Sequence, residues 1–355
     1  MSFFHSRWER GSMAMSNFQV QVLQLRDSAY QNGLVLGQQL RSNPIVKTFE
    51  MITREEIDVQ EMAAIYRAYA PHLLDELQGI SEGLGISWEK AAALFGGYDV
   101  PKTDAMGCSA MMTPAYYVRN YDFSPALYDG YFTLLQSNSA FATAGYNLQV
   151  IGRHDGVNQH GLTMGLHFVS NHGYTKGLSA WSAIRMILDT CTSVDEAILM
   201  LKEMPHAACY NFSLGDKSGN MAVIEASPEL VQIRRDPEQL SCVNHFQVDQ
   251  LAEKNRSVIT GSLKRQAYFQ SLRDKAHNHE EMFALFKDVQ SPLFFTDYAD
   301  LFGTLHTFSY AYEDAKIMTS VARGSQILVI DFADWVRGND IETKFLEGII
   351  EENKK

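Results

Sequence analysis

The 355-residue sequence predicts an α+β fold in which antiparallel sheets are covered by helical layers. Two observations lead to this prediction. Residues 27–96 repeat apolar side chains at helical spacing, whereas short runs of aromatic and β-branched residues begin at residue 107. Pairs of helical patterns then separate the groups of strands. A doubly wound parallel fold would instead alternate one strand with one helix.

Four helices are expected in the first part of the chain. The first lies within RDSAYQNGLVLGQQLR, and the second lies within TREEIDVQEMAAIYRAYA and ends before Pro71. The third, PHLLDELQGISEGLGIS, has Pro71 in its first turn and stops at Gly83 and Gly85. The fourth is short and covers residues 88–95.

Strands dominate the remainder. GCSAMM begins an apolar, strand-like run, and the next expected strands are YYVRNYDF, YFTLLQS, NLQVIG and GLTMGLHFV. Two helices follow, SAWSAIRMILDT and DEAILMLKEM, and a capping box of Ser193 and Glu196 opens the second. A predicted meander comes next: NFSLGD, MAVIEAS, LVQIRR and SCVNHF. Helices near 262–274 and 279–288 precede the last expected strands, LHTFSYAYE, AKIMTSVA and SQILVID.

The composition excludes several classes of protein. The net charge of -12 argues against binding to nucleic acid or to anionic lipid, because both require clustered cations. No apolar run approaches the roughly 20 residues of a membrane helix. The N-terminal stretch MSFFHSRWERGSMAMS is too charged for a secretory signal, and we expect part of it to be a leader before a native start at Met13 or Met15. Four cysteines without a C-x-x-C pair predict a reduced, cytoplasmic protein.

The Gly107-Cys108 pair suggests a nucleophile. A thiol attacks carbonyls as its thiolate and needs a nearby base. If the Gly107-Cys108 bond breaks, Cys108 gains a free α-amino group with a pKa of about 7.7–8.0, so that one residue supplies both nucleophile and base. Glycine before the cysteine also tolerates the backbone angles that a side chain needs to reach back to its preceding carbonyl. The cut would be an acyl shift onto sulfur followed by hydrolysis.

GCS followed by RNYDF resembles the N-terminal-nucleophile hydrolases of the choloylglycine hydrolase and penicillin V acylase group. It is still more similar to their relatives of the acyl-coenzyme A:6-aminopenicillanic acid acyltransferase type. ELQGISEGLGISWEKAAAL, DGVNQHGLTMGLHF, NFSLGDKSGNMAVIEASP and SLKRQAYF resemble further family segments in the same order, over roughly residues 25–330. The resemblance implies a four-layer αββα sandwich with a helical N-terminal segment.

The resemblance also implies roles for individual residues. Cys108 would be the nucleophile. Asp122 would orient its α-ammonium group, and Arg119 would hold the thiolate and the substrate. The oxyanion hole would use the backbone N–H of Asn158 and the side-chain amide of Asn211. Arg265 would be a further catalytic residue, and only its S-x-x-R context supports this assignment.

The chain departs from the bile-salt and penicillin V enzymes in two ways. Only 11 residues separate Cys108 from Arg119, which favours the acyltransferase branch. In addition, 107 residues precede the cysteine, so an internal cut is required unless the protein is an inactive precursor. We therefore expect a helical pro-segment or α-chain at 1–107, packed on an αββα domain at 108–355.

Each residue also has an ordinary structural explanation. A cysteine at the start of a strand is often a small buried hydrophobe. Arg119 and Asp122 could form a structural ion pair, and Asn158 and Asn211 could cap turns. His154, His160, His167 and His172 are spaced by 6, 7 and 5 residues, which fits neither a helix face nor a zinc loop, so we expect no metal and no cofactor.

The sequence therefore predicts a cysteine amidohydrolase that cuts itself and then cleaves linear amides with an apolar acyl group. An acyltransferase using the same site is the alternative, with an amide or acyl thioester as its small-molecule substrate. A non-catalytic, uncut binding protein of the same fold is a third possibility. Homo-oligomerisation is left open.

Overall fold

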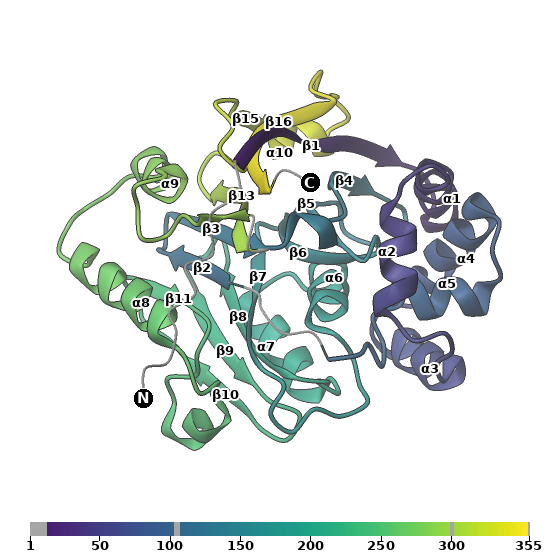
Figure 1. The fold of residues 1–355 in the computed structure, drawn as a ribbon, viewed down its shortest axis with the longest axis horizontal. Helices are drawn as coiled ribbons and strands as arrows, with labels where there is room; N and C mark the ends of the chain where they lie inside the picture. Colours follow the sequence, from purple (N-terminus) through teal and green to yellow (C-terminus); the bar gives the residue numbers. More distant parts are fainter. Residues whose placement is uncertain (1–12, 103–106, 299–301, 354–355) are drawn as a thin grey trace, which may run out of the picture.

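A computed structural model describes residues 13–102, 107–298 and 302–353, and the fold is two stacked sheets between helices (Figure 1). The leader expected before Met13 or Met15 lies mostly outside the described residues. The larger sheet has nine strands in this order: β10 (Val231–Arg234), β9 (Met221–Ala226), β8 (Cys209–Gly215), β7 (Thr163–Ser170), β6 (Gly152–Asn158), β5 (Thr143–Leu148), β4 (Tyr131–Gln136), β1 (Met13–Arg26) and β16 (Phe345–Asn353). All neighbours are antiparallel except β1 and β4.

The smaller sheet has seven strands. Six follow the order β11 (Leu240–Cys242), β2 (Gly107–Met112), β3 (Tyr116–Phe123), β13 (Phe302–Ala311), β14 (Lys316–Val321) and β15 (Leu328–Asp331). The seventh, β12 (Thr296–Asp297), pairs with β13. Strands β2 and β3 are buried along their whole length because the larger sheet covers one face and helices cover the other.

Helical pairs form the two outer layers. The nine-stranded sheet carries α6 (Ala180–Thr190) and α7 (Val194–Glu203), and the seven-stranded sheet carries α8 (Thr260–Leu272) and α9 (His279–Lys287). In Figure 1, α8 and α9 lie on the opposite side of the sheets from α6. The expected αββα order of layers is confirmed.

A cluster of helices from the N-terminal segment packs beside the sandwich (Figure 1). These are α1 (Ala29–Leu40), α2 (Ile45–Ile52), α3 (Val59–Tyr69), α4 (His72–Leu84) and α5 (Trp88–Phe95). Gly85, at φ 81°, ends α4 in the left-handed conformation. Helices α1 and α4 touch backbone to backbone, because a Cβ on Gly33 would lie 2.1 Å from the carbonyl oxygen of Glu76. The sequence analysis did not predict α2.

The N-terminal segment also contributes a strand that the sequence analysis missed. Strand β1 lies between β4 and β16 in the larger sheet, and its first residue, Met13, pairs with Asn353. Strand β16 and the short helix α10 (Phe332–Val336) were missed as well. The two segments on either side of Gly107-Cys108 therefore share one sheet.

Three local predictions were wrong. NLQVIG is interrupted by a turn at residues 149–151 between β5 and β6, because Asp129 accepts hydrogen bonds from the backbone N–H groups of Gln149 and Val150 and both residues have positive φ. Ser193 caps α7, but the Glu196 carboxylate accepts from Thr192, so the capping box is incomplete. The predicted four-stranded meander is split, because β11 crosses to the smaller sheet and pairs with β2.

Candidate active site

Cys108 lies at the second position of β2, in the interior of the sandwich, and is 0% exposed. Its backbone N–H donates to Asn244 Oδ1 at 2.8 Å. Its backbone carbonyl accepts from Arg265 Nη1 at 2.5 Å. Its sulfur accepts from Arg119 Nη2 at 3.1 Å. Every polar group of this residue is thus held by a side chain from another element.

Arg119 reaches the sulfur from β3, the antiparallel neighbour of β2. The guanidinium is fully buried and forked: Nη2 donates to Cys108 Sγ and to the carbonyl of Leu166, while Nη1 donates to Asp155. Asp155 comes from β6 in the opposite sheet, and the sequence analysis did not single it out. The arginine therefore joins the two sheets at Cys108.

The sulfur is protonated in this arrangement. Burial raises the pKa of the Cys108 thiol to about 11, although the positive charges of Arg119 and Arg265 act in the opposite direction. A thiol with this pKa is a poor nucleophile at neutral pH. Cys108 is therefore held in its thiol form.

Asp122 lies beside the peptide bond that the cut would break, because it pairs with Gly107 across β2 and β3. Its Oδ1 accepts from Thr304 Oγ1 at 2.7 Å, and its Oδ2 lies 3.9 Å from Arg265 Nη1. Burial raises the pKa of Asp122 to about 6, against the opposing effect of Arg265. Asp122 can therefore exchange a proton near neutral pH.

Arg265 extends from α8 and contacts the same region from outside the smaller sheet. Besides the Cys108 carbonyl, it donates to Ser109 Oγ and to Asn244 Oδ1, each at 2.9 Å. Arg119, Asp122 and Arg265 thus all surround Cys108, which makes Arg265 a firmer part of the site than its sequence context suggested.

Asn244 is a site residue that the sequence analysis missed. It follows β11 directly, and its Oδ1 binds both Cys108 and Arg265. Its Nδ2 donates to the Phe168 carbonyl at 2.9 Å, which leaves the second amide hydrogen without an acceptor in the described structure. The only signal in the sequence is a polar Asn-His pair directly after the apolar end of SCVNHF.

The two asparagines proposed for the oxyanion hole are engaged elsewhere. The backbone N–H of Asn158 donates to the Leu162 carbonyl, and its Nδ2 donates to the carbonyls of Leu188 and Cys191. The Nδ2 of Asn211 donates to the carbonyls of Val243 and His245. Asn158 thus joins the β6–β7 turn to the end of α6, and Asn211 supports the loop that carries Asn244.

Gly107 is required for space rather than for an unusual backbone angle. It is not among the glycines with positive φ. A Cβ at this position would lie 2.4 Å from the ring of Phe302 and 3.1 Å from Cβ of Asp122. The reason given from the sequence is therefore replaced by a steric one.

A small apolar hollow is connected to Cys108 through Tyr210, Phe168 and Asn244. It is lined by Val100, Pro101, Asn171, Tyr174, Ser179, Trp181, Ala207, Ala208 and Tyr210, and its volume is about 20 Å³. The ring of Tyr210 packs against Phe168, whose carbonyl binds Asn244 beside the nucleophile. Tyr174 Oη donates to the carbonyl of Val100, so the chain before the cysteine helps to fill this hollow.

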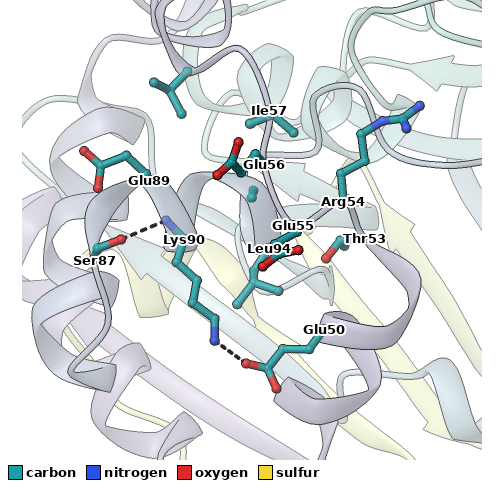
Figure 2. Close-up of a pocket in the computed structure, with 12 residues that line it drawn as sticks. Glu50, Thr53, Arg54, Glu55, Glu56, Ile57, Ser87, Glu89, Lys90 and Leu94 are labelled. Carbon is teal, nitrogen blue, oxygen red and sulfur yellow. Dashed lines mark hydrogen bonds and ion pairs between the residues drawn. The ribbon is translucent and has the colours of Figure 1, made fainter.

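A larger cavity of about 700 Å³ lies elsewhere, among α2, α3 and α5 (Figure 2). Its wall includes an ion pair between Lys90 and Glu50 and three further glutamates, Glu55, Glu56 and Glu89. None of its lining residues is one of the site residues described above. The candidate active site is therefore identified by its side-chain geometry and not by cavity size.

The histidines considered for a metal are separate in space. His154 packs on Tyr121, His160 packs on Phe141, and His167 hydrogen-bonds Ser213. Within residues 13–102, 107–298 and 302–353, no group of three His, Cys, Asp or Glu side chains could hold a metal ion. In the same part of the chain, no helix is long and apolar enough to cross a membrane.

Comparisons with known proteins give the family. The acyl-coenzyme A:6-aminopenicillanic acid acyl-transferase family matches residues 111–326, more than half of the chain. The match includes Arg119, Asp122, Asn244 and Arg265 and begins three residues after Cys108. A search of curated proteins found no match.

Several solved structures are similar to this chain. One is a conjugated bile acid hydrolase variant from Clostridium perfringens, with 13% identity, a TM-score of 0.45, and coverage of 70% of this chain and 97% of that one. Penicillin V acylase from Agrobacterium tumefaciens has 15% identity, a TM-score of 0.38 and coverage of 64% and 78%. A Caenorhabditis elegans ortholog of N-acylethanolamine-hydrolyzing acid amidase has 10% identity, a TM-score of 0.41 and coverage of 59% and 95%.

The four-layer αββα sandwich, in which Cys108 lies on β2 and Arg119 and Asp122 lie on the neighbouring β3, is the fold of the N-terminal-nucleophile hydrolases. The chain belongs to the acyl-coenzyme A:6-aminopenicillanic acid acyl-transferase family. This membership indicates an enzyme of amide hydrolysis or acyl transfer.

Proposed function

We propose that the protein is a cysteine amidohydrolase that activates itself by cutting Gly107-Cys108 and then cleaves the C–N bond of linear amides. The observation that supports this most is the placement of Arg119, Asp122 and Arg265 around one sulfur and one peptide bond. The three side chains are almost fully buried, and only a functional or strongly structural role justifies burying so many charges.

The activating cut is an intramolecular acyl shift. Cys108 Sγ attacks the carbonyl carbon of Gly107, the thiol proton passes to the nitrogen of Cys108, and the C–N bond breaks to leave a thioester. Water then hydrolyses the thioester and releases a carboxylate on Gly107. Asp122, with a pKa of about 6, is the group nearest the bond that can move a proton near neutral pH.

The cut creates the base for turnover. The new α-amino group of Cys108 accepts the thiol proton, and Asn244 Oδ1, which already accepts the N–H at 2.8 Å, would orient this amine. The thiolate attacks the substrate carbonyl, the amine passes its proton to the leaving nitrogen, and water releases the acid from the thioester. Arg119 stabilises the thiolate through Nη2.

The oxyanion donors are assigned differently from the sequence-based expectation. We propose that Asn244, with its free amide hydrogen, serves this role, and that Asn158 and Asn211 hold the surrounding backbone. The backbone N–H of Asn158 and the side-chain amide of Asn211, which were expected to bind the oxyanion, already donate to backbone carbonyls. An oxyanion donor of this kind is typically worth about 2.7–4 kcal/mol of barrier.

An apolar acyl group is the substrate part that this site would bind. Tyr174, Trp181 and Tyr210 line the hollow, and Tyr210 packs against Phe168, whose carbonyl binds Asn244. Val100 and Pro101 also line it, and after the cut these two residues no longer belong to the same piece of chain as Cys108. The hollow would then enlarge to accept an acyl chain.

Acyl transfer is the second candidate, and the family name favours it. The same thioester would then be resolved by an amine, and the donor would be an amide or an acyl-coenzyme A thioester. Trapping with hydroxylamine separates the two: an amidohydrolase yields hydroxamate from amides, and an acyl-coenzyme A-dependent transferase yields it only from the thioester.

A non-catalytic, uncut protein remains the third candidate, and the buried, protonated thiol is the observation in its favour. The proposed substrate is a small molecule. The proposal also includes a cytoplasmic location and leaves the oligomeric state open. The four free cysteines support a reducing compartment such as the cytoplasm.

A further inference from the structure

A buried histidine from the far side of the site contacts Asp155, the partner of Arg119. His306 Nε2 lies 2.8 Å from Asp155 Oδ2, and its Nδ1 lies 2.6 Å from Tyr128 Oη. His306 and Asp155 are both 0% exposed. One carboxylate oxygen, Oδ2, therefore binds both the histidine and Arg119, while Oδ1 has no hydrogen-bond partner among the residues that the structure describes.

The sheets are locally irregular where these two residues lie. The pairing of β13 with β3 shifts register between Thr304 and His306, and the pairing of β5 with β6 shifts between Tyr146 and Asn147, which leaves His154 unpaired before Asp155. Such bulges re-aim neighbouring side chains and are frequent beside active sites. Here they direct one residue of each sheet toward the other across the interior.

The aromatic surroundings fix the ring of His306. The Tyr146 ring stacks on it at 3.7 Å and 9°, and the Tyr121 ring lies nearly parallel at 5.4 Å. His154, which also lies near the imidazole, contacts the Tyr121 ring at 3.9 Å. The charged groups that face His306 are Asp155 and, beyond it, Arg119.

The protonation states define one direction of hydrogen bonding. Burial lowers the pKa of His306, so the ring is neutral, and burial raises the pKa of Tyr128 well above its usual range, so the phenol keeps its proton. Asp155 is ionised, because the charge of Arg119 and the hydrogen bond from His306 outweigh the effect of burial and lower its pKa. Tyr128 thus donates to Nδ1, and Nε2–H donates to Asp155.

We propose that His306 is a positioning residue that holds Asp155, and through it the guanidinium of Arg119, against the sulfur of Cys108. The inference rests on the proposed function of Cys108 as nucleophile. Arginine and carboxylate favour a two-bond, bidentate pair. Within the described part of the chain, Arg119 Nε and Asp155 Oδ1 are both buried without hydrogen-bond partners, so such a pair is available here. His306 binds Oδ2 of Asp155 from the other side and so limits Arg119 to one bond with this carboxylate, through Nη1. Nη2 of Arg119 then stays directed at the sulfur.

Two substitutions of His306 separate positioning from packing. In His306→Gln the amide lies where Nε2 was and can still donate to Asp155. In His306→Asn the amide lies where Nδ1 was and cannot reach Asp155. Each variant is tested as the full chain. Intact mass gives the rate of cutting at Gly107-Cys108, and iodoacetamide labelling at several pH values gives the thiol pKa. Thermal unfolding verifies that both variants fold.

We expect His306→Asn to slow cutting and alkylation at pH 7 by about tenfold or more, with the thiol pKa raised by about one unit, which corresponds to tenfold less thiolate. We expect His306→Gln to remain within about threefold of the native protein. Tyr128→Phe removes the hydrogen bond to Nδ1 and allows the other ring tautomer, so its cutting rate should lie between those of the two His306 variants. It replaces His306→Asn in the comparison if that variant does not fold. Equal behaviour of the Gln and Asn variants would overturn the inference.

Failure of this inference is distinguishable from failure of the proposed function. Cys108→Ala must abolish both cutting and the labelling that peptide mass mapping places on Cys108; the mapping is required because all four cysteines are buried. If Cys108→Ala still cuts, the nucleophile is elsewhere. If it does not cut and the two His306 variants behave alike, only the role of His306 is wrong.

Discussion

Arg185 Nη2 and Glu76 Oε2 form a buried ion pair at 2.6 Å, and a second contact of 3.1 Å joins Nη1 to Oε1. Glu76 lies on α4 of the N-terminal segment, and Arg185 lies on α6 of the sandwich. Asp189 extends the network, since it accepts from Arg185 Nε and contacts His72 Nε2, each at 2.8 Å. The N-terminal segment is thus tied to the sandwich both by these charges and by β1.

We predict that the two pieces stay together after cutting. They should co-elute in native size exclusion and separate only in denaturant, because removal of β1 would expose two strand edges. Glu76→Ala leaves Arg185 buried with one partner fewer, which typically costs about 3–5 kcal/mol. It should therefore lower the midpoint of urea-induced separation. Asp75→Ala, an exposed position on the same helix, is the control and should change little.

The second prediction concerns pH. The pKa of Asp122 is about 6 in the folded protein, above the ordinary value of 3.8, so the folded state binds the proton more tightly than the unfolded state. Its stabilising effect is complete below about pH 4 and is lost as the pH rises through 6. In a Cys108→Ala background, which prevents cutting, Asp122→Asn should remove this loss. Urea unfolding at pH 4, 5, 6 and 7 measures it, and parallel curves for the two proteins would contradict the prediction.

The third prediction separates the three asparagines. Asn244→Ala should slow cutting by about 100-fold or more, in line with the loss of one oxyanion donor. Asn158→Ala and Asn211→Ala each leave two buried carbonyls without donors and should mainly lower the melting temperature. Cutting is followed by mass at a temperature where all variants are folded. Normal cutting by Asn244→Ala, with a loss in either of the others, would restore the assignment made from the sequence.

The fourth prediction tests the steric role of Gly107. Gly107→Ala should slow cutting, because the new Cβ meets the Phe302 ring and pushes the scissile bond away from Asp122. Phe302→Leu should restore much of the rate in the double variant, since the ring atoms that clash are removed. Phe302→Leu alone is the control. If the double variant is as slow as Gly107→Ala, the requirement for glycine is one of backbone conformation after all.

The layers of the fold could be predicted because each strand and helix carries its own local pattern. Strand β1 could not, since its partner β16 lies more than 300 residues away and nothing near Met13 indicates that pairing. The turn at Gln149 and Val150 escaped for the same reason, because the carboxylate that holds it belongs to Asp129.

The same limit applies to the site. Cys108, Arg119 and Asp122 lie within one short segment on paired strands, so the sequence order already brings them together. Asn244, Asp155 and His306 reach the sulfur's surroundings from three other strands or loops, and no local spacing indicates that they meet. Motif similarity assigned Asn158 and Asn211 to the oxyanion hole. Which N–H groups remain free to bind an oxyanion depends, however, on their hydrogen bonds to neighbouring carbonyls, and the sequence does not show these bonds.

The most direct test is the intact mass of the denatured protein, with Cys108→Ala beside it. We predict that the native chain gives two fragments that divide between Gly107 and Cys108, and that the Cys108→Ala chain gives a single species near 40.0 kDa. A single full-length species from the native chain, after incubation at neutral pH, would contradict the proposed self-activation.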